Sequence, residues 1–185
     1  MAGDRLYLAH GDTTLNGQVR TGSVSTDGGG LVTSTSLGSQ QNGSIQIGTN
    51  IGEMETLTMT NSNGATRFAT ADGDEISDGM DALVLTSESA NGRNRGWMGN
   101  AIALDFDHQT FGMWATGVGT SDGSVSVGSF GSRTASANVP TSGTATYQGT
   151  TVGMAVTTDG RALVSESQIG LTTSDFSNIN VASTN

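Results

Sequence analysis

Apolar and polar residues alternate along this chain in several short stretches. In each stretch every second residue is apolar, which is the period of a strand that buries one face and exposes the other. The pattern therefore predicts half-buried antiparallel strands. The apolar positions that define these strands are Ile45 and Ile47, Leu57 and Met59, Ile102, Leu104 and Phe106, Val125 and Val127, Val152, Met154 and Val156, and Ile169 and Leu171.

Glycine directly after asparagine or aspartate punctuates the same sequence. This dipeptide readily adopts the positive φ angles of tight hairpin turns. Together with the alternation it predicts an all-β fold, an antiparallel β-barrel or sandwich with tight Asx-Gly hairpins. The nine dipeptides are Asn16-Gly17, Asp27-Gly28, Asn42-Gly43, Asn63-Gly64, Asp72-Gly73, Asp78-Gly79, Asn91-Gly92, Asp122-Gly123 and Asp159-Gly160.

Two segments depart from this pattern. Apolar residues follow helical spacing only between Asp74 and Leu85, so we predict at most one short helix, near Ile76 to Leu85. The segment from Thr21 to Gln41 is rich in Ser, Thr and Gly and is typical of a linker. We therefore expect an extended N-terminal arm or linker at 1–41 and a β-barrel-like domain at 42–185.

Composition narrows the function classes. Gly, Thr and Ser contribute 28, 27 and 22 of the 185 residues, and lysine and cysteine are absent. The absence of cysteine excludes disulfides and thiolate metal sites. A net charge of −10 argues against nucleic-acid binding and against binding to anionic membranes, since both need a cationic face. No window approaches the roughly 20 apolar residues of a membrane helix, so we expect no membrane insertion.

Candidate catalytic residues are few. The two histidines, His10 and His108, lie far apart in sequence and outside any HExxH motif. Asp105 and Asp107 adjoin His108, but a solvated strand face accounts for these carboxylates as well as an acid–base role does. We therefore predict a protein that is not an enzyme and has no catalytic residues, no metal site and no cofactor.

The densest acidic cluster, ADGDEISDGMD, contains Asp72, Asp74, Asp78 and Asp81. A calcium loop of the EF-hand type needs an oxygen ligand where Ile76 stands and a glutamate at the twelfth position, and both are missing. The interpretation we favour is a solvated acidic loop. Calcium binding within Asp72–Asp81 stays an open alternative.

One cationic segment stands out in this acidic protein. Arg93, Arg95 and Trp97 lie together in the glycine-rich sequence NGRNRGWMGN. Arg and Trp are enriched among the residues that anchor protein interfaces, so these three form a candidate partner-binding loop. A plain surface turn with Trp97 tucked in is the alternative, because tryptophan is buried on average.

Three segments resemble a known family. They are ALDFDHQTFGMWATG (103–117), GSFGSRTASANVPTSGTATYQGTTVGMAV (128–156) and IGLTTSDFSNINV (169–181), and together they are similar to the β-barrel domain of the transferrin-binding protein B-like family. This family includes factor-H-binding-like bacterial surface proteins. The resemblance implies a barrel whose inner face Tyr147 would help to fill, and a host protein or a haem-like ligand as partner. The family's anchor cysteine is missing here.

These features lead to two functional hypotheses. The first is a structural or interaction protein of an exterior surface, namely the decoration or fibre protein of a phage virion, because no export signal is visible. The alternative is a ligand-binding or host-protein-binding module of a bacterial cell surface, as the resemblance implies. The corresponding locations are the virion surface and the extracellular cell surface.

The expected partners are copies of the same chain and a larger scaffold such as a capsid or cell surface. We expect Leu6, Tyr7 and Leu8 to contact that scaffold. Lysine, the usual residue that protects edge strands, is absent, so open sheet edges would have to be covered by neighbouring subunits. The sequence therefore predicts a homo-oligomer.

Overall fold

The computed structural model describes residues 13–50, 53–79, 84–100, 104, 109–131, 135–138, 140–157, 162–176 and 178–184. Most of them are in strands, which confirms the all-β prediction. In this part of the chain the helical residues form two 3₁₀ turns, η1 (Thr70–Asp72) and η3 (Ser136–Asn138). The strands are β1 (Thr13–Thr26), β2 (Val32–Asn50), β3 (Glu53–Asn61), β4 (Gly64–Ala69), β5 (Glu75–Gly79), β6 (Val84–Glu88), β7 (Arg95–Gly99), β8 (Gln109–Thr116), β9 (Gly123–Gly131), β10 (Ala145–Val156), β11 (Ala162–Thr173) and β12 (Asn180–Thr184).

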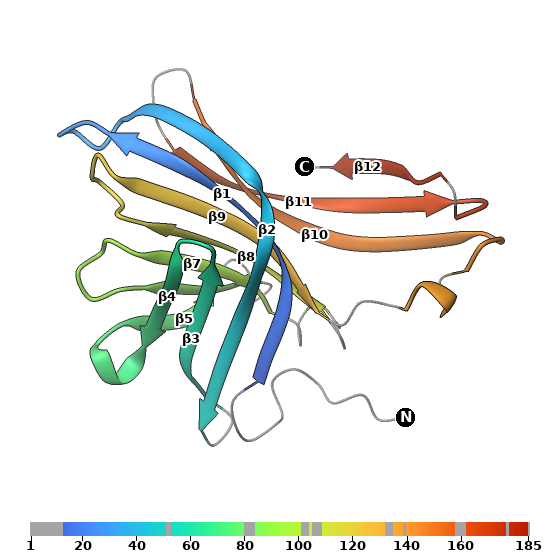
Figure 1. The fold of residues 1–185 in the computed structure, drawn as a ribbon, viewed down its shortest axis with the longest axis horizontal. Coiled ribbons are helices and arrows are strands. Elements are labelled where there is room, and N and C mark those ends of the chain that lie inside the picture. The colour runs from blue at the N-terminus through green and yellow to red at the C-terminus, as the bar shows by residue number, and fades with distance from the viewer. Residues whose placement is uncertain are drawn as a thin grey trace. The chain divides into compact units, whose positions relative to one another are not determined.

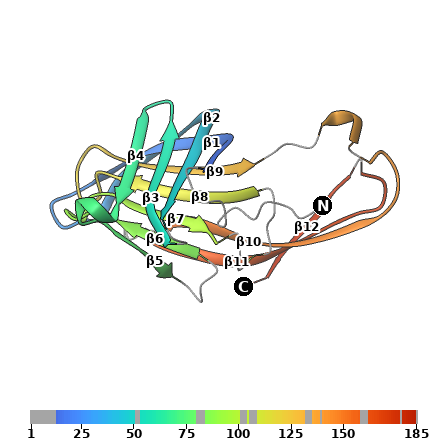
Figure 2. The same ribbon diagram turned by 90° about the horizontal axis from the view of Figure 1, so that it is seen from below.

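The described residues divide into two compact units. The first is built on a nine-stranded antiparallel sheet in the order β4-β3-β2-β1-β9-β8-β7-β6-β5 (Figure 1). Figure 2 shows β3 and β4 at a steep angle to β8 and β9, because the twist between neighbouring strands accumulates across the sheet. The edge strands β4 and β5 follow each other in the chain through η1 and contact each other. The sheet is therefore a nearly closed barrel.

Apolar side chains from seven strands fill the barrel interior. They belong to one contiguous core, so the interior is packed. Leu15, Met54, Ile76 and Leu85 pack against this core while remaining partly exposed. The fully buried members are Val19, Ile45, Ile47, Leu57, Met59, Phe68, Met98, Trp114 and Phe130.

Small residues make room for the largest core side chain. Trp114 on β8 lies directly opposite Gly96 on β7 and Ser126 on β9, and opposed residues in an antiparallel pair point to the same face. Its indole packs against Phe130 with the ring centroids 6.4 Å apart and the planes tilted by 37°. The interior therefore alternates large and small residues between adjacent strands.

The structure reverses the predicted burial of β9. The alternation is present, but Val127 is 39 % exposed while Ser126 is 1 % exposed. Because Ser126 lies opposite Trp114, that register turns Val125 and Val127 to the outer face. The strands predicted around Ile45, Leu57, Met154 and Ile169 are confirmed as parts of β2, β3, β10 and β11.

The one short helix that the sequence permitted near Ile76 to Leu85 does not form in the described residues. Strand β5 ends at Gly79 and β6 begins at Val84, and Ile76 pairs with Ser87 in an antiparallel ladder. Pairing of β6 with β7 draws this segment into the sheet, which overrides the weak helical spacing. Leu104 also departs from its prediction, since it lies in a turn rather than in a strand.

Residues 13–41 do not form a separate arm. They make up β1 and the first part of β2, and β1 lies between β2 and β9 in the sheet order. Backbone pairing to both neighbours holds this polar segment in place, so the barrel extends across the boundary predicted at Gln41. Residues 1–12 of the predicted arm lie outside the described residues.

The Asx-Gly turns are confirmed in part. Asp27-Gly28, Asn63-Gly64, Asp72-Gly73, Asn91-Gly92 and Asp122-Gly123 lie at strand connections. Asn16-Gly17, Asn42-Gly43 and Asp78-Gly79 lie inside β1, β2 and β5. Gly17 and Gly43 face each other across β1 and β2. A Cβ atom on Gly17 would collide with the Ser129 carbonyl of β9, so this glycine permits close strand approach rather than a turn. Asp159-Gly160 lies outside the described residues.

The second unit contains a three-stranded sheet in the order β10-β11-β12. Strands β11 and β12 are antiparallel, with Leu171 opposite Val181. Across β10 and β11 the hydroxyls of Thr151 and Ser167 are 2.8 Å apart, and Gly149 faces Ile169. The same alignment sets Tyr147 opposite Leu171.

Candidate functional site

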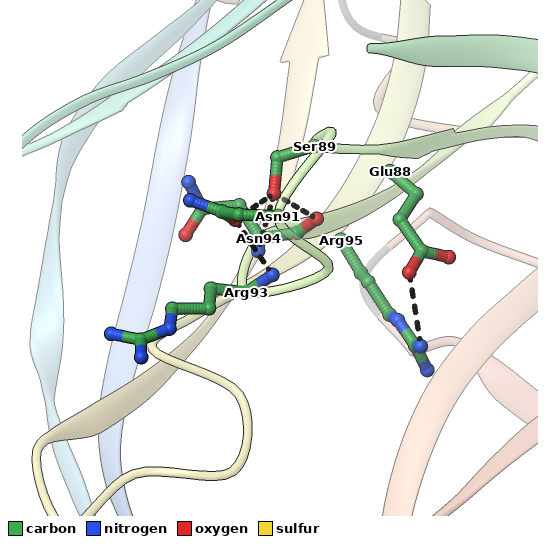
Figure 3. Close-up of polar contacts among 6 residues, drawn as sticks. All are labelled: Glu88, Ser89, Asn91, Arg93, Asn94 and Arg95. Atoms are coloured by element: carbon green, nitrogen blue, oxygen red, sulfur yellow. Dashed lines mark hydrogen bonds and ion pairs between the residues drawn. The ribbon is translucent and has the colours of Figure 1, made fainter.

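The predicted partner-binding loop is the connection between β6 and β7. Asn91 organises it, since its Oδ1 atom accepts hydrogen bonds from the Ser89 hydroxyl and from the Arg93 N–H, both at 2.9 Å (Figure 3). The Asn94 N–H in turn donates to Ser89 Oγ at 2.9 Å. Gly92 has φ +69°, a left-handed conformation that glycine adopts at little cost. These bonds give the loop one defined shape.

The two arginines of this segment have different surroundings. The Arg95 guanidinium forms an ion pair with Glu88 across β6 and β7, with N and O 3.1 Å apart. Figure 3 shows the Arg93 side chain extending away from that pair. In the described part of the chain its guanidinium has no hydrogen bond and no ion pair. Arg93 is therefore the cation of this segment that is free to meet a partner.

Trp97 lies in β7 rather than in the loop. It follows Arg95 by two residues, so both side chains project from the outer face of the barrel. Trp97 is half-buried there, opposite Thr86 on β6 and Met113 on β8. The structure thus brings Arg95 and Trp97 onto one face and sets Arg93 at the loop, while the role of these residues in binding stays a prediction.

Hydrogen bonds join this loop directly to two other connections at the same end of the barrel, and one of these connections is bonded to the end of β1, where a third connection begins. We call the four connections the rim (residues 27–31, 70–74, 89–94 and 117–122). The Val118 N–H donates to the Arg93 carbonyl at 2.9 Å, and the Thr26 N–H and hydroxyl both donate to the Thr120 carbonyl. The Ala90 N–H donates to Asp74 Oδ1 at 2.9 Å. Figure 1 shows the four connections together at the left of the molecule.

The described residues of the acidic cluster stabilise the fold. Asp72 forms an ion pair with Arg67, and Asp74 accepts hydrogen bonds from backbone N–H groups. No group of three or more His, Cys, Asp or Glu side chains that could hold a metal ion occurs among the described residues. The side chain of Asp78 and all of Asp81 lie outside the described part, so calcium binding there stays open.

A polar cluster interrupts the apolar interior. The Asn61 amide reaches from β3 to donate to Ser126 Oγ at 2.8 Å and to Thr21 Oγ1 at 3.2 Å, and these two hydroxyls are themselves 2.8 Å apart. Elsewhere in the interior Ser87 Oγ is buried and has no partner in the described chain. The sequence carries no signal for either feature, because serine occurs 22 times along the chain and nothing local distinguishes Ser87 or Ser126.

The three-stranded sheet presents an apolar row on one face. The row consists of Tyr147, Leu171 and Val181, with Tyr147 52 % exposed and Val181 63 % exposed. The expectation that Tyr147 fills the inner face of a barrel is therefore wrong. Strands β10 and β12 each pair only with β11 among the residues that the structure describes, so both edges of this sheet are open.

Several predicted residues lie outside the described ranges. They are the scaffold-contact residues Leu6, Tyr7 and Leu8 and the catalytic candidates Asp105, Asp107 and His108. In the ranges that are described, no helix has the length and apolar character to span a membrane.

No family model matches the chain, and neither a curated protein nor a solved structure shows significant similarity to it. The resemblance to the transferrin-binding protein B-like family therefore stays a prediction.

Proposed function

We propose that this protein is a non-enzymatic structural and interaction protein that works as a homo-oligomer on an exterior surface, of the class of virion decoration or fibre proteins. The observation that carries the proposal is the three-stranded sheet, which combines an exposed apolar row with two open edges.

The edges of this sheet lack the usual protection. Monomeric proteins guard free edges with charged residues, proline or bulges. Strands β10 and β12 contain no charged residue and no proline over Ala145–Val156 and Asn180–Thr184. Neutral edges of this kind are typical of strands that a neighbouring subunit covers.

The apolar row also favours a neighbouring subunit as the partner of this sheet. Val181 and Tyr147 keep more than half of their surface exposed, and a small sheet gains stability when a second surface buries its apolar face. A second copy supplies an identical apolar row without any charged group opposite it. Burial of this row between subunits would remove the exposed apolar surface, and pairing of β10 or β12 with a strand of the neighbouring subunit would cover an open edge.

The outer face of the barrel supports an extracellular setting. Strands β1 and β2 expose amide side chains there, and Gln18 donates to Asn42 Oδ1 at 2.7 Å. Such neutral hydroxyl and amide groups stay hydrated without attracting polyanions, in keeping with a net charge of −10. A surface of this chemistry suits a particle exterior better than a nucleic-acid-packed interior.

Sedimentation of the full chain at micromolar concentration tests self-assembly. We expect a discrete oligomer, and we expect Val181→Lys to reduce its mass because the new charge would be buried in the contact. Gln168→Lys is the matched control, since it adds the same charge to the opposite face of the sheet. A monomeric native chain, or equal masses for the native chain and Val181→Lys, would contradict the proposal.

Location needs a separate measurement. Antibodies raised against the purified protein should label intact virions in electron micrographs. Labelling of bacterial envelopes instead would favour the alternative, a cell-surface binding module. The free guanidinium of Arg93 at the rim is the observation in favour of that second function, because arginine is a frequent interface anchor.

A further inference from the structure

A long part of β2 extends beyond the barrel as an open edge. Strand β2 pairs with β1 over most of its length, whereas its pairing with β3 begins only at Ser44. Among the described residues, no strand pairs with the other side of Val32–Asn42. Every residue from Thr33 to Asn42 is exposed.

This segment, VTSTSLGSQQN, has no charge and no proline. At about 3.3 Å per residue its 11 residues span roughly 36 Å of unpaired backbone. The edge strands β4 and β5 differ from this segment. They carry charged residues such as Arg67 and Glu75, and hydrogen bonds to the Asp74 carboxylate join the two sides. The open side of β2 therefore has the properties of an edge that accepts another strand.

We propose that Val32–Asn42 pairs with the same segment of a second copy, antiparallel and about a two-fold axis at Leu37. The inference rests on the proposed self-assembly but places it on a different surface, in the barrel rather than in the three-stranded sheet. A pairing of this length forms about ten backbone hydrogen bonds, the number that a typical protein interface contains.

Two features favour a second copy over a foreign strand. The segment is neutral within an acidic chain, so two copies meet here without opposing like charges. Its one large apolar side chain, Leu37, is 68 % exposed and stands at the centre of the open segment. The symmetric register sets Leu37 against Leu37 of the partner subunit, so that each leucine covers the other.

The same register extends an apolar row of the barrel. Leu37 lies opposite Gly22 on β1, Gly22 lies opposite Val125 on β9, and Val125 lies opposite Ala115 on β8. Pairing at Leu37 would continue this row through the two-fold axis into the second barrel. The two nine-stranded sheets would then form one continuous sheet.

Cysteine cross-linking tests the register directly, because the chain has no cysteine of its own. Directly opposed residues in an antiparallel pair have Cα atoms about 4.5–5.5 Å apart, which a disulfide can bridge. Under mild oxidation Leu37→Cys should therefore give a covalent dimer. Thr33→Cys is the control, since the proposed register holds its two copies roughly 27 Å apart.

A mixture sharpens the same test. With Leu37 on the two-fold axis, the register pairs Thr33 with Gln41 of the partner subunit. Thr33→Cys and Gln41→Cys should each stay monomeric on a non-reducing gel, whereas their mixture should yield a heterodimer. Circular dichroism confirms that each variant folds, which these exposed positions favour.

The outcomes separate this inference from the proposed function. We expect about tenfold more dimer for Leu37→Cys than for Thr33→Cys, and the same yield in a chain that also carries Val181→Lys. Equal yields for the two cysteine variants would overturn the inference, whatever Val181→Lys does. Efficient cross-linking together with an unchanged mass for Val181→Lys would overturn the three-stranded-sheet interface alone.

Discussion

Asp74 Oδ1 accepts a hydrogen bond from the backbone N–H of Ala90 at 2.9 Å. Its other carboxylate oxygen accepts one from the N–H of Ala69 at 3.0 Å. Ala69 ends β4, one edge of the nine-stranded sheet, and Ala90 lies in the loop beyond β6, which neighbours the other edge strand, β5. A single carboxylate therefore ties the two sides of the barrel seam together.

Removing this carboxylate should loosen the seam. We expect Asp74→Ala to lower the free energy of unfolding by about 2–3 kcal/mol, since hydrogen bonds to a charged group contribute about 1.5–3 kcal/mol each and Asp74 is partly exposed. Urea denaturation measures the change. Asp72→Ala is the control, because its ion pair with Arg67 is exposed and contributes about 0–1 kcal/mol. Equal losses for the two variants would refute the seam assignment.

Two interior serines should respond in opposite directions to the same substitution. Ser87 Oγ is buried without a partner in the described chain, so Ser87→Ala should raise the free energy of unfolding by about 1 kcal/mol. Ser126→Ala should lower it by about 1–2 kcal/mol, because Asn61 and Thr21 each lose a hydrogen bond. Thermal unfolding of both variants under one condition makes the comparison, and a loss of stability in Ser87→Ala would contradict it.

Gly17, inside β1, and Gly28, in the β1–β2 hairpin, should differ in how well they tolerate substitution by alanine. Gly17→Ala would place a Cβ atom against the backbone of β9, so we expect a loss of about 1–3 kcal/mol from overpacking. Gly28→Ala meets no atom within 4 Å and should leave the stability nearly unchanged. Chemical denaturation compares the two. A well-tolerated Gly17→Ala would show that β1 and β9 are not so close at this point.

The stability of the β6–β7 loop should depend on the Asn91 side-chain amide rather than on the Arg93 guanidinium. Asn91→Ala removes the acceptor for the Ser89 hydroxyl and the Arg93 N–H, so we expect a loss of about 1–2 kcal/mol. Arg93→Ala should change stability by less than about 0.5 kcal/mol, as is usual for a surface substitution away from such features. Calorimetric melting of both variants provides the measurement. A large destabilisation in Arg93→Ala would mean that its side chain belongs to the fold.

Much of the fold could be predicted because its signals are local. Alternation at Ile45 and Ile47, and at Leu57 and Met59, follows the geometry of a single strand and needs no knowledge of its partners. The hairpin at Asn63-Gly64 is local in the same way, since glycine at φ +135° closes the turn. The candidate loop was also visible, because Arg93 and Arg95 are rare cations in an acidic chain.

The sequence by itself therefore determined the all-β class, the position of five strands (β2, β3, β9, β10 and β11) and the neutral character of the open edges. The tertiary structure decided which face of a strand is buried, as in β9, where Trp114 requires the small Ser126 opposite and turns Val127 outward. It also decided that Ile76 lies in a strand and that Asp74 holds the seam. These outcomes depend on contacts between residues far apart in the chain, and a local pattern has the same period whichever partner packs against it.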